Sequence, residues 1–176
     1  MGILEVGSQL PAPLLASLAD FTASGGADDA REVVHVRNRL WRGAMESLRP
    51  AVTATGDYVR LLKGEGRASD RSELEAAVPL LLEKERRLAS QREQILEQIE
   101  ALRSSASEHA PELLDDVKHT SIALDDLLAT WLEALRDLRW EAMLILAERE
   151  PREAGSPIET PEQVAAWFAE LDKPEK

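Results

Sequence analysis

Residues 111–149 read PELLDDVKHTSIALDDLLATWLEALRDLRWEAMLILAER, and their apolar side chains recur at alternating steps of three and four. This spacing is the a/d pattern of a heptad repeat, so it predicts one long amphipathic helix of about 58 Å. Ser121 is the one polar residue that interrupts the series. The expected core positions are Leu114, Val117, Leu124, Leu128, Trp131, Leu135, Leu138, Ala142 and Ile145.

The stretch 28–63 carries a similar series. Pro50 lies inside it, and a proline within a helix usually bends or breaks that helix. Because the steps of three and four continue on both sides of Pro50, we expect a single helix that bends there. Its expected core positions are Val34, Asn38, Trp41, Met45, Leu48, Val52, Thr55, Val59 and Leu62.

The stretch 72–106 is expected to form the third long helix, and it opens with a capping box, SELE. Two polar residues of this stretch, Glu85 and Arg92, fall at core positions. A buried charge needs a partner, because its desolvation is otherwise costly. Trp41 and Asp125 lie at a suitable height along the bundle to serve Arg92.

Two shorter helices are expected near the ends of the chain. Residues 11–23 begin with prolines and end at Ser-Gly-Gly, which predicts a helix that covers Val33, Val36 and Leu40. Residues 150–160 form a linker, and residues 161–171 form a second short helix. Two apolar stripes of identical spacing are therefore expected to meet: Trp140, Met143, Leu144 and Ala147 with Val164, Trp167, Phe168 and Leu171.

These patterns predict an all-α fold. We expect an elongated, antiparallel bundle of three long helices, similar to a coiled coil, with the short N- and C-terminal helices packing alongside. The bundle would occupy residues 1–149 and be followed by the linker 150–160 and the docking helix 161–171. Its expected helices are residues 11–23, 28–63, 72–106 and 111–149.

The composition argues against several classes of function. The 176-residue chain has a net charge of −12, which disfavours binding to duplex nucleic acid, because phosphate contacts need clustered Lys and Arg. It has no cysteine, so it can form neither disulfides nor thiolate metal sites. No apolar run is long enough for a membrane span, and the N-terminus lacks the basic stretch of a signal peptide. We therefore expect a cytoplasmic protein.

Two pairs of a carboxylate and a histidine have the i, i+3 spacing that metal sites in helical bundles use. They are Glu32 with His35 and Asp116 with His119. The heptad registers place both pairs on the outer surface, whereas such ligands must face the interior of the bundle. We therefore favour solvated histidines over a metal site.

Four acidic residues form an ExxE…ExxD series: Glu97, Glu100, Glu112 and Asp115. This order resembles the magnesium-binding motif of the all-α nucleotide pyrophosphohydrolases, the MazG-like group, although it lacks the paired glutamates that usually open the first motif. The resemblance implies carboxylates that hold magnesium for the attack of water on a nucleoside triphosphate. The heptad register instead places these acids on the outer surface, where a dimer would be needed to bury them, so a solvated acidic face is favoured.

Basic residues gather along one side of the stretch 28–63. We expect them to face acids of a neighbouring helix, and the alternative is a strip that docks an anionic partner. The basic residues are Arg31, His35, Arg39, Arg42 and Arg49, and the expected acids are Asp115, Asp125, Asp126 and Asp137.

The sequence has no nucleophile elbow, no HExxH motif and no recognisable Ser/His/Asp arrangement. We therefore expect a non-enzymatic protein–protein interaction module without a cofactor, such as an adaptor, a chaperone or an acidic antitoxin-like protein. Its partner would be another protein, either basic or presenting an amphipathic helix that replaces residues 161–171 on the stripe around Trp140. Two alternatives remain open: a magnesium-dependent enzyme of the pyrophosphohydrolase type, and a structural coiled coil that self-associates, for example as a homodimer.

Overall fold

The computed structural model describes residues 29–65 and 70–149, together with Ile3, Leu14 and Ala27. This part of the chain is helical apart from short connections, and it contains no strand. The elements are α2 (Ala30–Gly43), η1 (Ala44–Leu48), α3 (Arg49–Glu65), α4 (Arg71–His109), η2 (Pro111–Leu113) and α5 (Leu114–Arg149).

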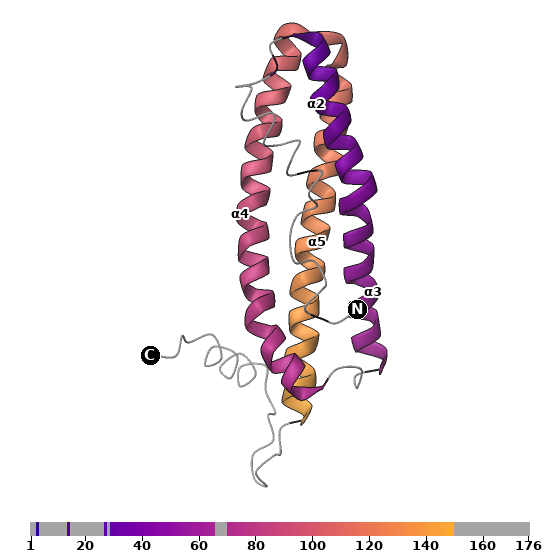
Figure 1. Cartoon of the computed structure of the whole chain (residues 1–176), viewed down its shortest axis with the longest axis vertical. Coiled ribbons are helices and arrows are strands. Elements are labelled where there is room, and N and C mark those ends of the chain that lie inside the picture. The colour runs from indigo at the N-terminus through magenta and orange to yellow at the C-terminus, as the bar shows by residue number, and fades with distance from the viewer. Residues whose placement is uncertain (1–2, 4–13, 15–26, 28, 66–69, 150–176) are drawn as a thin grey trace, which may run out of the picture.

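The helices form long rods that lie side by side in Figure 1. The elements α2, η1 and α3 follow one another without a break and form the first rod, while α4 and α5 form the others. In this view the chain runs down the first rod, returns along α4 and runs down again along α5. The α5 helix has its most extensive contact with α4 and also contacts α2, η1 and α3. The predicted all-α fold with three long helices packed together is confirmed, whereas residues 150–160 and 161–171 lie outside the described residues.

The apolar series of α5 forms the middle of the core. Its predicted core side chains are buried, apart from Leu114, which is half-buried. Trp131 is the largest fully buried side chain of the described residues. Its indole Nε1 donates a hydrogen bond to Oγ1 of Thr55 on α3 at 3.1 Å, and Thr55 Oγ1 donates to the carbonyl oxygen of Ala51 at 2.8 Å. The polar edge of the tryptophan is therefore satisfied inside the core.

The first rod contains a π-helical turn, η1, which ends two residues before Pro50. In this turn the N–H of Arg49 donates to the carbonyl oxygen of Ala44, five residues back. Pro50 has no N–H of its own, and in a regular α-helix its ring would clash with the carbonyl group of residue 46. A wider turn at this place relieves the clash while the helix continues. The prediction of one continuous helix through Pro50 is confirmed.

The π-turn also shifts the core register, which corrects the predicted series for the first half of this rod. From Leu48, the last residue of the turn, onward, the predicted positions Leu48, Thr55, Val59 and Leu62 are buried and Val52 is half-buried, as is Met45 within the turn. Before it, the buried residues are Val33, Val36, Leu40 and Gly43, while the predicted Val34, Asn38 and Trp41 face outward. A π-turn adds one residue to the helical repeat, so it moves the apolar face by one position.

The ends of α4 differ from the prediction by a few residues. The N-cap is Asp70, whose Oδ1 accepts a hydrogen bond from the N–H of Arg71 at 2.8 Å, and not the expected Ser72. Ser72 lies inside the first turn and its Oγ is 3.2 Å from Asp70 Oδ2. An aspartate at the N-cap supplies a side-chain acceptor for a backbone N–H, as a serine would, and adds a negative charge at the positive end of the helix dipole. Pro111 then opens the short helix η2, which leads into α5.

The N-terminal part of the chain contributes to the core through three described residues, Ile3, Leu14 and Ala27. Ile3 and Leu14 are fully buried and belong to the same hydrophobic cluster as the residues of the three rods. Leu14 lies so close to Gly43 that a Cβ atom on this glycine would be 3.2 Å from the Cα of Leu14. The glycine therefore permits close approach of the two backbones. The rest of the predicted helix 11–23 lies outside the described residues.

Candidate partner-binding site

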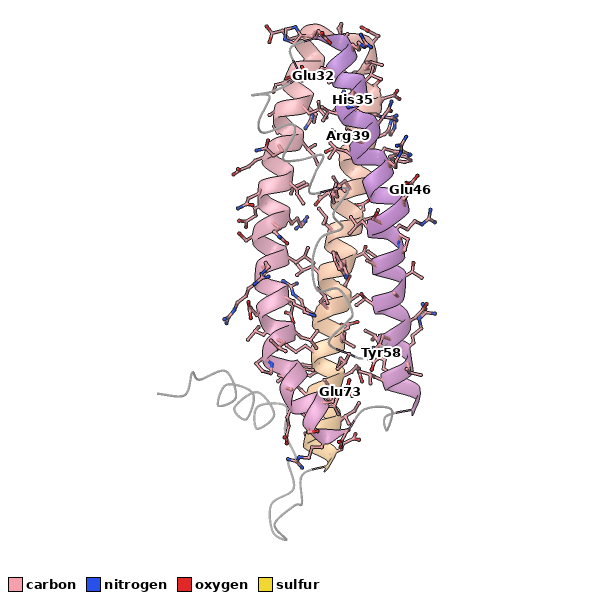
Figure 2. All side chains as sticks on the ribbon, in the orientation of Figure 1. Glu32, His35, Arg39, Glu46, Tyr58 and Glu73 are labelled. Carbon is pink, nitrogen blue, oxygen red and sulfur yellow. The ribbon has the colours of Figure 1, made fainter. Side chains whose placement is uncertain are left out.

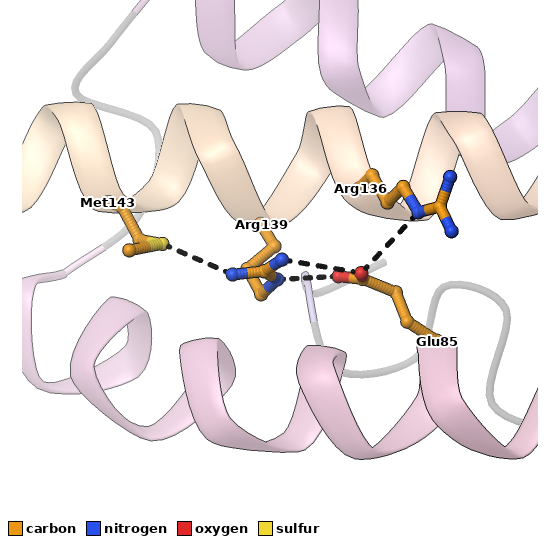
Figure 3. A network of polar contacts seen from close by, with 4 residues as sticks. All are labelled: Glu85, Arg136, Arg139 and Met143. Carbon is orange, nitrogen blue, oxygen red and sulfur yellow. Dashed lines mark hydrogen bonds and ion pairs between the residues drawn. The ribbon is translucent and has the colours of Figure 1, made fainter. Parts of the chain in front are cut away.

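The predicted docking stripe on α5 is only partly exposed. Trp140 is 47% exposed, and Leu144, one turn further along α5, is half-buried. Met143 is buried, at 4% exposure, and its side chain points toward α4 (Figure 3). It follows Arg139 by one helical turn and therefore lies on the face of α5 that packs against α4. The complementary residues Val164, Trp167, Phe168 and Leu171 lie outside the described residues.

A buried carboxylate beside this stripe joins α4 to α5 (Figure 3). The side chain of Glu85 is 8% exposed, and Arg139 donates to both of its oxygens, from Nε at 2.6 Å and from Nη2 at 3.3 Å. Arg136 Nε lies 3.9 Å from the same carboxylate, and Arg139 Nη1 lies 3.6 Å from Sδ of Met143. Glu85 was predicted to need a partner, and Arg136 and Arg139 provide it. The signal for these two arginines in the sequence was their i, i+3 spacing next to the apolar core positions of α5.

The second polar residue at a core position of α4 also has its partner on α5. Arg92 donates from Nε to Oδ1 of Asp125 at 2.8 Å, and its Nη2 lies 2.6 Å from the same oxygen. Asp125 was one of the two partners expected for Arg92, and this expectation is confirmed. Two ion pairs, Glu85–Arg139 and Arg92–Asp125, therefore tie α4 to α5 at different heights.

The predicted basic strip lies along the first rod, where Figure 2 shows His35 and Arg39 on α2. Arg31, His35, Arg42 and Arg49 are exposed, whereas Arg39 is half-buried. Arg42 Nε lies 4.0 Å from a carboxylate oxygen of Glu46, one turn further on. Among the expected acidic partners, Asp125 instead pairs with Arg92, and Asp115 pairs with Lys118 at 3.3 Å. Asp126 and Asp137 are exposed.

An aromatic group that the register prediction placed in the core lies on the surface of α2. Trp41 is 38% exposed, and the guanidinium carbon of Arg37 is 5.8 Å from the centre of its ring. Arg37 is held in place by two further contacts, Nε to Thr120 Oγ1 at 3.1 Å and Nη1 to Asn38 Oδ1 at 3.0 Å. Such a cation–π contact orients both side chains. The sequence prediction did not single out Arg37.

The acidic residues of the pyrophosphohydrolase-like series lie on the surface. Glu97, Glu100, Glu112 and Asp115 are exposed, and Glu100 pairs with Arg103 at 2.6 Å. Among the described residues, no three His, Asp or Glu side chains converge on a point where they could hold a metal ion. The two carboxylate–histidine pairs do not form such a group either.

The pKa of one described group, Lys84, is shifted from its ordinary value. Partial burial lowers the pKa of the Lys84 ammonium, and desolvation is its cause. Lys84 is separated from Glu97 by 13 positions of α4, which is about 20 Å along the helix axis. This lysine therefore lies far from the acidic series.

Comparison of the chain with protein-family models, with curated proteins and with solved structures finds no match. The helices in the described part of the chain do not combine the length and the apolar character that crossing a membrane requires.

Proposed function

We propose that this chain is a non-enzymatic protein-binding module. Its scaffold would be an elongated antiparallel bundle, with short helices at residues 11–23 and 161–171 packed alongside the three rods. In this proposal the helix 161–171 covers Trp140 and Leu144 on α5, and an amphipathic helix of a partner protein can replace it. Since the side chain of Met143 is buried and points toward α4, Trp140 and Leu144 would provide the accessible part of this surface.

The observation that supports the proposal is the exposure of two tryptophans, Trp41 and Trp140, on helices that are otherwise well packed. Tryptophan is enriched at the energetic centres of protein interfaces because it buries a large apolar area and loses little conformational entropy. Both residues lie on long helices tied to their neighbours, so each is presented by a rigid element.

The competing proposal of a magnesium-dependent enzyme receives less support. Its four carboxylates are exposed, and two of them are engaged by basic neighbours, Glu100 by Arg103 and Asp115 by Lys118. An active site of this kind needs several carboxylates aimed at one point in a cleft that excludes water. An assembly that buries the four acids between chains would be required.

The proposal is tested by a position-specific crosslink in the full-length protein within its own host cells. A photoreactive residue replaces Leu144, and in a matched control it replaces Ile122, which is 59% exposed on the same helix. We expect the probe at position 144 to capture a discrete partner protein that the probe at 122 does not capture. Adding Trp140→Ala to the 144 probe should lower the yield at least tenfold.

Equal patterns from the two probe positions would contradict the proposal, because the surface around Trp140 would then have no preferred partner. A crosslink from position 144 to residues 161–171 of the same chain would show that the terminal helix covers this surface in the free protein. Mass spectrometry of the crosslinked peptides separates these results.

A further inference from the structure

The outward face of α2 carries a heptad-spaced stripe that lies outside the buried core of the bundle. Val34, Asn38 and Trp41 follow at i, i+4 and i+7, so they lie along one line on the helix surface. Val34 is 39% exposed and Trp41 is 38% exposed. The register shift at η1 turns this stripe away from the core, where Val33, Val36 and Leu40 lie instead. We infer that the stripe binds an acidic amphipathic helix of a partner protein.

The shape of this face suits a helix. The α2 stripe, which we define as Val34, Asn38 and Trp41, borders a small hollow of about 40 Å³ between α2 and α5. Val34 and Leu113 line this hollow from its two sides, together with Val117. One apolar side chain of a bound helix can enter there while others contact Trp41. This arrangement is a helix-in-groove mode, which is read as anchors at successive helical turns.

The aromatic anchor of the α2 stripe is fixed before any partner arrives. Arg37 lies over the ring of Trp41 and is itself held by Thr120 of α5 and by Asn38. A side chain that is already ordered loses less entropy on binding than a mobile one. Trp41 therefore has the properties of a preorganised interface residue, and Arg37 is its positioning residue.

The charge around the stripe selects the sign of the partner. The segment from Ala30 to Arg49 contains five arginines and two glutamates, in a chain whose net charge is −12. Arg31, His35 and Arg42 line the edge of the α2 stripe that faces away from α5, and all three are exposed. Asp116 lies at the opposite edge, beside the hollow. A bound helix is therefore expected to place its acidic residues over the arginine edge and its neutral side toward Asp116.

The same charges disfavour a second copy of this chain as the occupant. Two α2 helices packed through this stripe would bring Arg37 and Arg42 of one chain toward Arg37 and Arg42 of the other. Like charges at the flanking positions of a helix pair oppose association. A negatively charged membrane is disfavoured as well, because the net charge of the whole chain is strongly negative and the apolar stripe is narrow.

This inference deepens the proposed function and rests on it. The test uses the full-length protein and a synthetic three-heptad peptide with Leu at positions a and d and Glu at e and g. A twin peptide has Lys in place of every Glu. We expect the acidic peptide to bind at least tenfold more tightly than its twin, with an affinity that falls as salt is added. A peptide of residues 157–176 is titrated in parallel as a competitor.

Protein variants place the binding on the α2 stripe. We expect Trp41→Ala to weaken the acidic peptide at least tenfold, and the exposed pair of changes Arg31→Glu and Arg42→Glu to reverse the preference toward the lysine twin. The matched controls Leu80→Ala and Leu61→Ala, each at an exposed apolar position, should change the affinity less than twofold. Circular dichroism of each variant checks that its helix content is unchanged.

Several results would overturn the inference. These are equal affinity for the two peptides, no binding of the acidic one, insensitivity to the Arg31/Arg42 reversal, or an effect of Leu80→Ala as large as that of Trp41→Ala. Displacement of the acidic peptide by residues 157–176 would assign the stripe to this chain's own C-terminus, and tighter binding to anionic lipid vesicles would assign it to a membrane. None of these outcomes predicts the result of crosslinking from position 144. The crosslink therefore tests the proposed function independently of the peptide titration.

Discussion

At the scale of single residues, the buried ion pair between Glu85 and Arg139 constrains how α4 aligns with α5. Glu85 sits between Leu81 and Leu88 in the apolar series of α4, and its two arginine partners both come from α5. A buried ion pair gains little net stability over a well-packed apolar pair, but an unpaired member is costly. Glu85 therefore acts against any pairing of the helices that would leave it without Arg139.

Replacing this carboxylate by an amide tests its contribution. We expect Glu85→Gln to lower the free energy of unfolding by about 1–3 kcal/mol, because the amide keeps the shape but leaves Arg139 without a counter-charge. The matched control is Glu83→Gln, two positions before Glu85 on α4. It removes an exposed ion pair between Glu83 and Arg87 and should change the free energy of unfolding by less than about 0.5 kcal/mol. Urea denaturation measures both. Equal effects of the two changes would contradict a special role for Glu85.

The hydrogen bond between Trp131 and Thr55 allows a second measurement at this scale. We expect Thr55→Val to cost about 1–3 kcal/mol, because it leaves the buried indole N–H without an acceptor. In a Trp131→Phe background the same change should cost much less, since phenylalanine has no N–H to satisfy. A double-mutant cycle from thermal or urea unfolding gives the coupling. A coupling near zero would mean that the hydrogen bond contributes nothing to stability.

At the scale of elements, the sequence predicted α5 well and half of the first rod incorrectly. The apolar series of α5 has a regular spacing from Val117 to Ile145, and burial follows it closely. In residues 30–65 two apolar series overlap, one through Val33, Val36 and Leu40 and the other through Val34 and Trp41. The π-turn determines which of the two series is buried. Its one signal in the sequence is Pro50, and a proline is equally compatible with a simple bend of an α-helix.

The extra residue of the π-turn can be removed. Deleting Glu46, which is exposed, together with Pro50→Ala should leave a regular α-helix whose buried positions stay in register from Val33 to Leu62. We expect this variant to fold with a melting temperature within a few degrees of the parent. The control deletes the exposed Asp57 in the same Pro50→Ala background, which shifts Val59 and Leu62 out of the core. If both deletions destabilise the protein equally, the register explanation is wrong.

The residues of the candidate surfaces could be predicted only where the heptad register of their helix was predicted correctly. Trp140 was expected outside the a/d seam of α5, in a stripe that residues 161–171 would cover. It lies outside the core at 47% exposure, and its cover by residues 161–171 stays a prediction. Its neighbour Met143 was assigned to the same stripe because the spacing fits, yet that position also faces α4, and the spacing of one helix does not reveal where its neighbour lies. Trp41 was assigned to the core for the same reason that Val34 was, and the π-turn exposes both.

At the scale of the whole molecule, the three rods do not form the core alone. Leu14 belongs to the central hydrophobic cluster although it precedes α2 by more than a dozen positions, and it lies against the backbone of Gly43 beside the π-turn. The turn and the N-terminal contact thus occur at the same height of the bundle. A core that depends on a segment outside the rods should unfold together with that segment in a single transition.

This dependence leads to a prediction for the complete chain. We expect Leu14→Ala to lower the free energy of unfolding by about 2–5 kcal/mol, the usual cost of removing a buried leucine side chain. The control Ile122→Ala removes an exposed side chain and should cost less than about 0.5 kcal/mol. If the N-terminal segment were an independent cover, Leu14→Ala would leave the main unfolding transition unchanged, and calorimetry would show it.

Gly43, which faces Leu14, can be compared with Gly56, which faces no neighbouring atom. Gly56→Ala should stabilise the protein by about 1 kcal/mol, because alanine is the better helix former and its Cβ would meet no neighbouring atom. Gly43→Ala gains the same helix propensity but presses on Leu14 at 3.2 Å, so we expect it to be less stable than Gly56→Ala. The difference in unfolding free energy between the two variants measures how firmly the N-terminal segment is held. Equal stabilisation by both changes would show that Leu14 moves away freely, and the whole-molecule core would then reduce to the three rods.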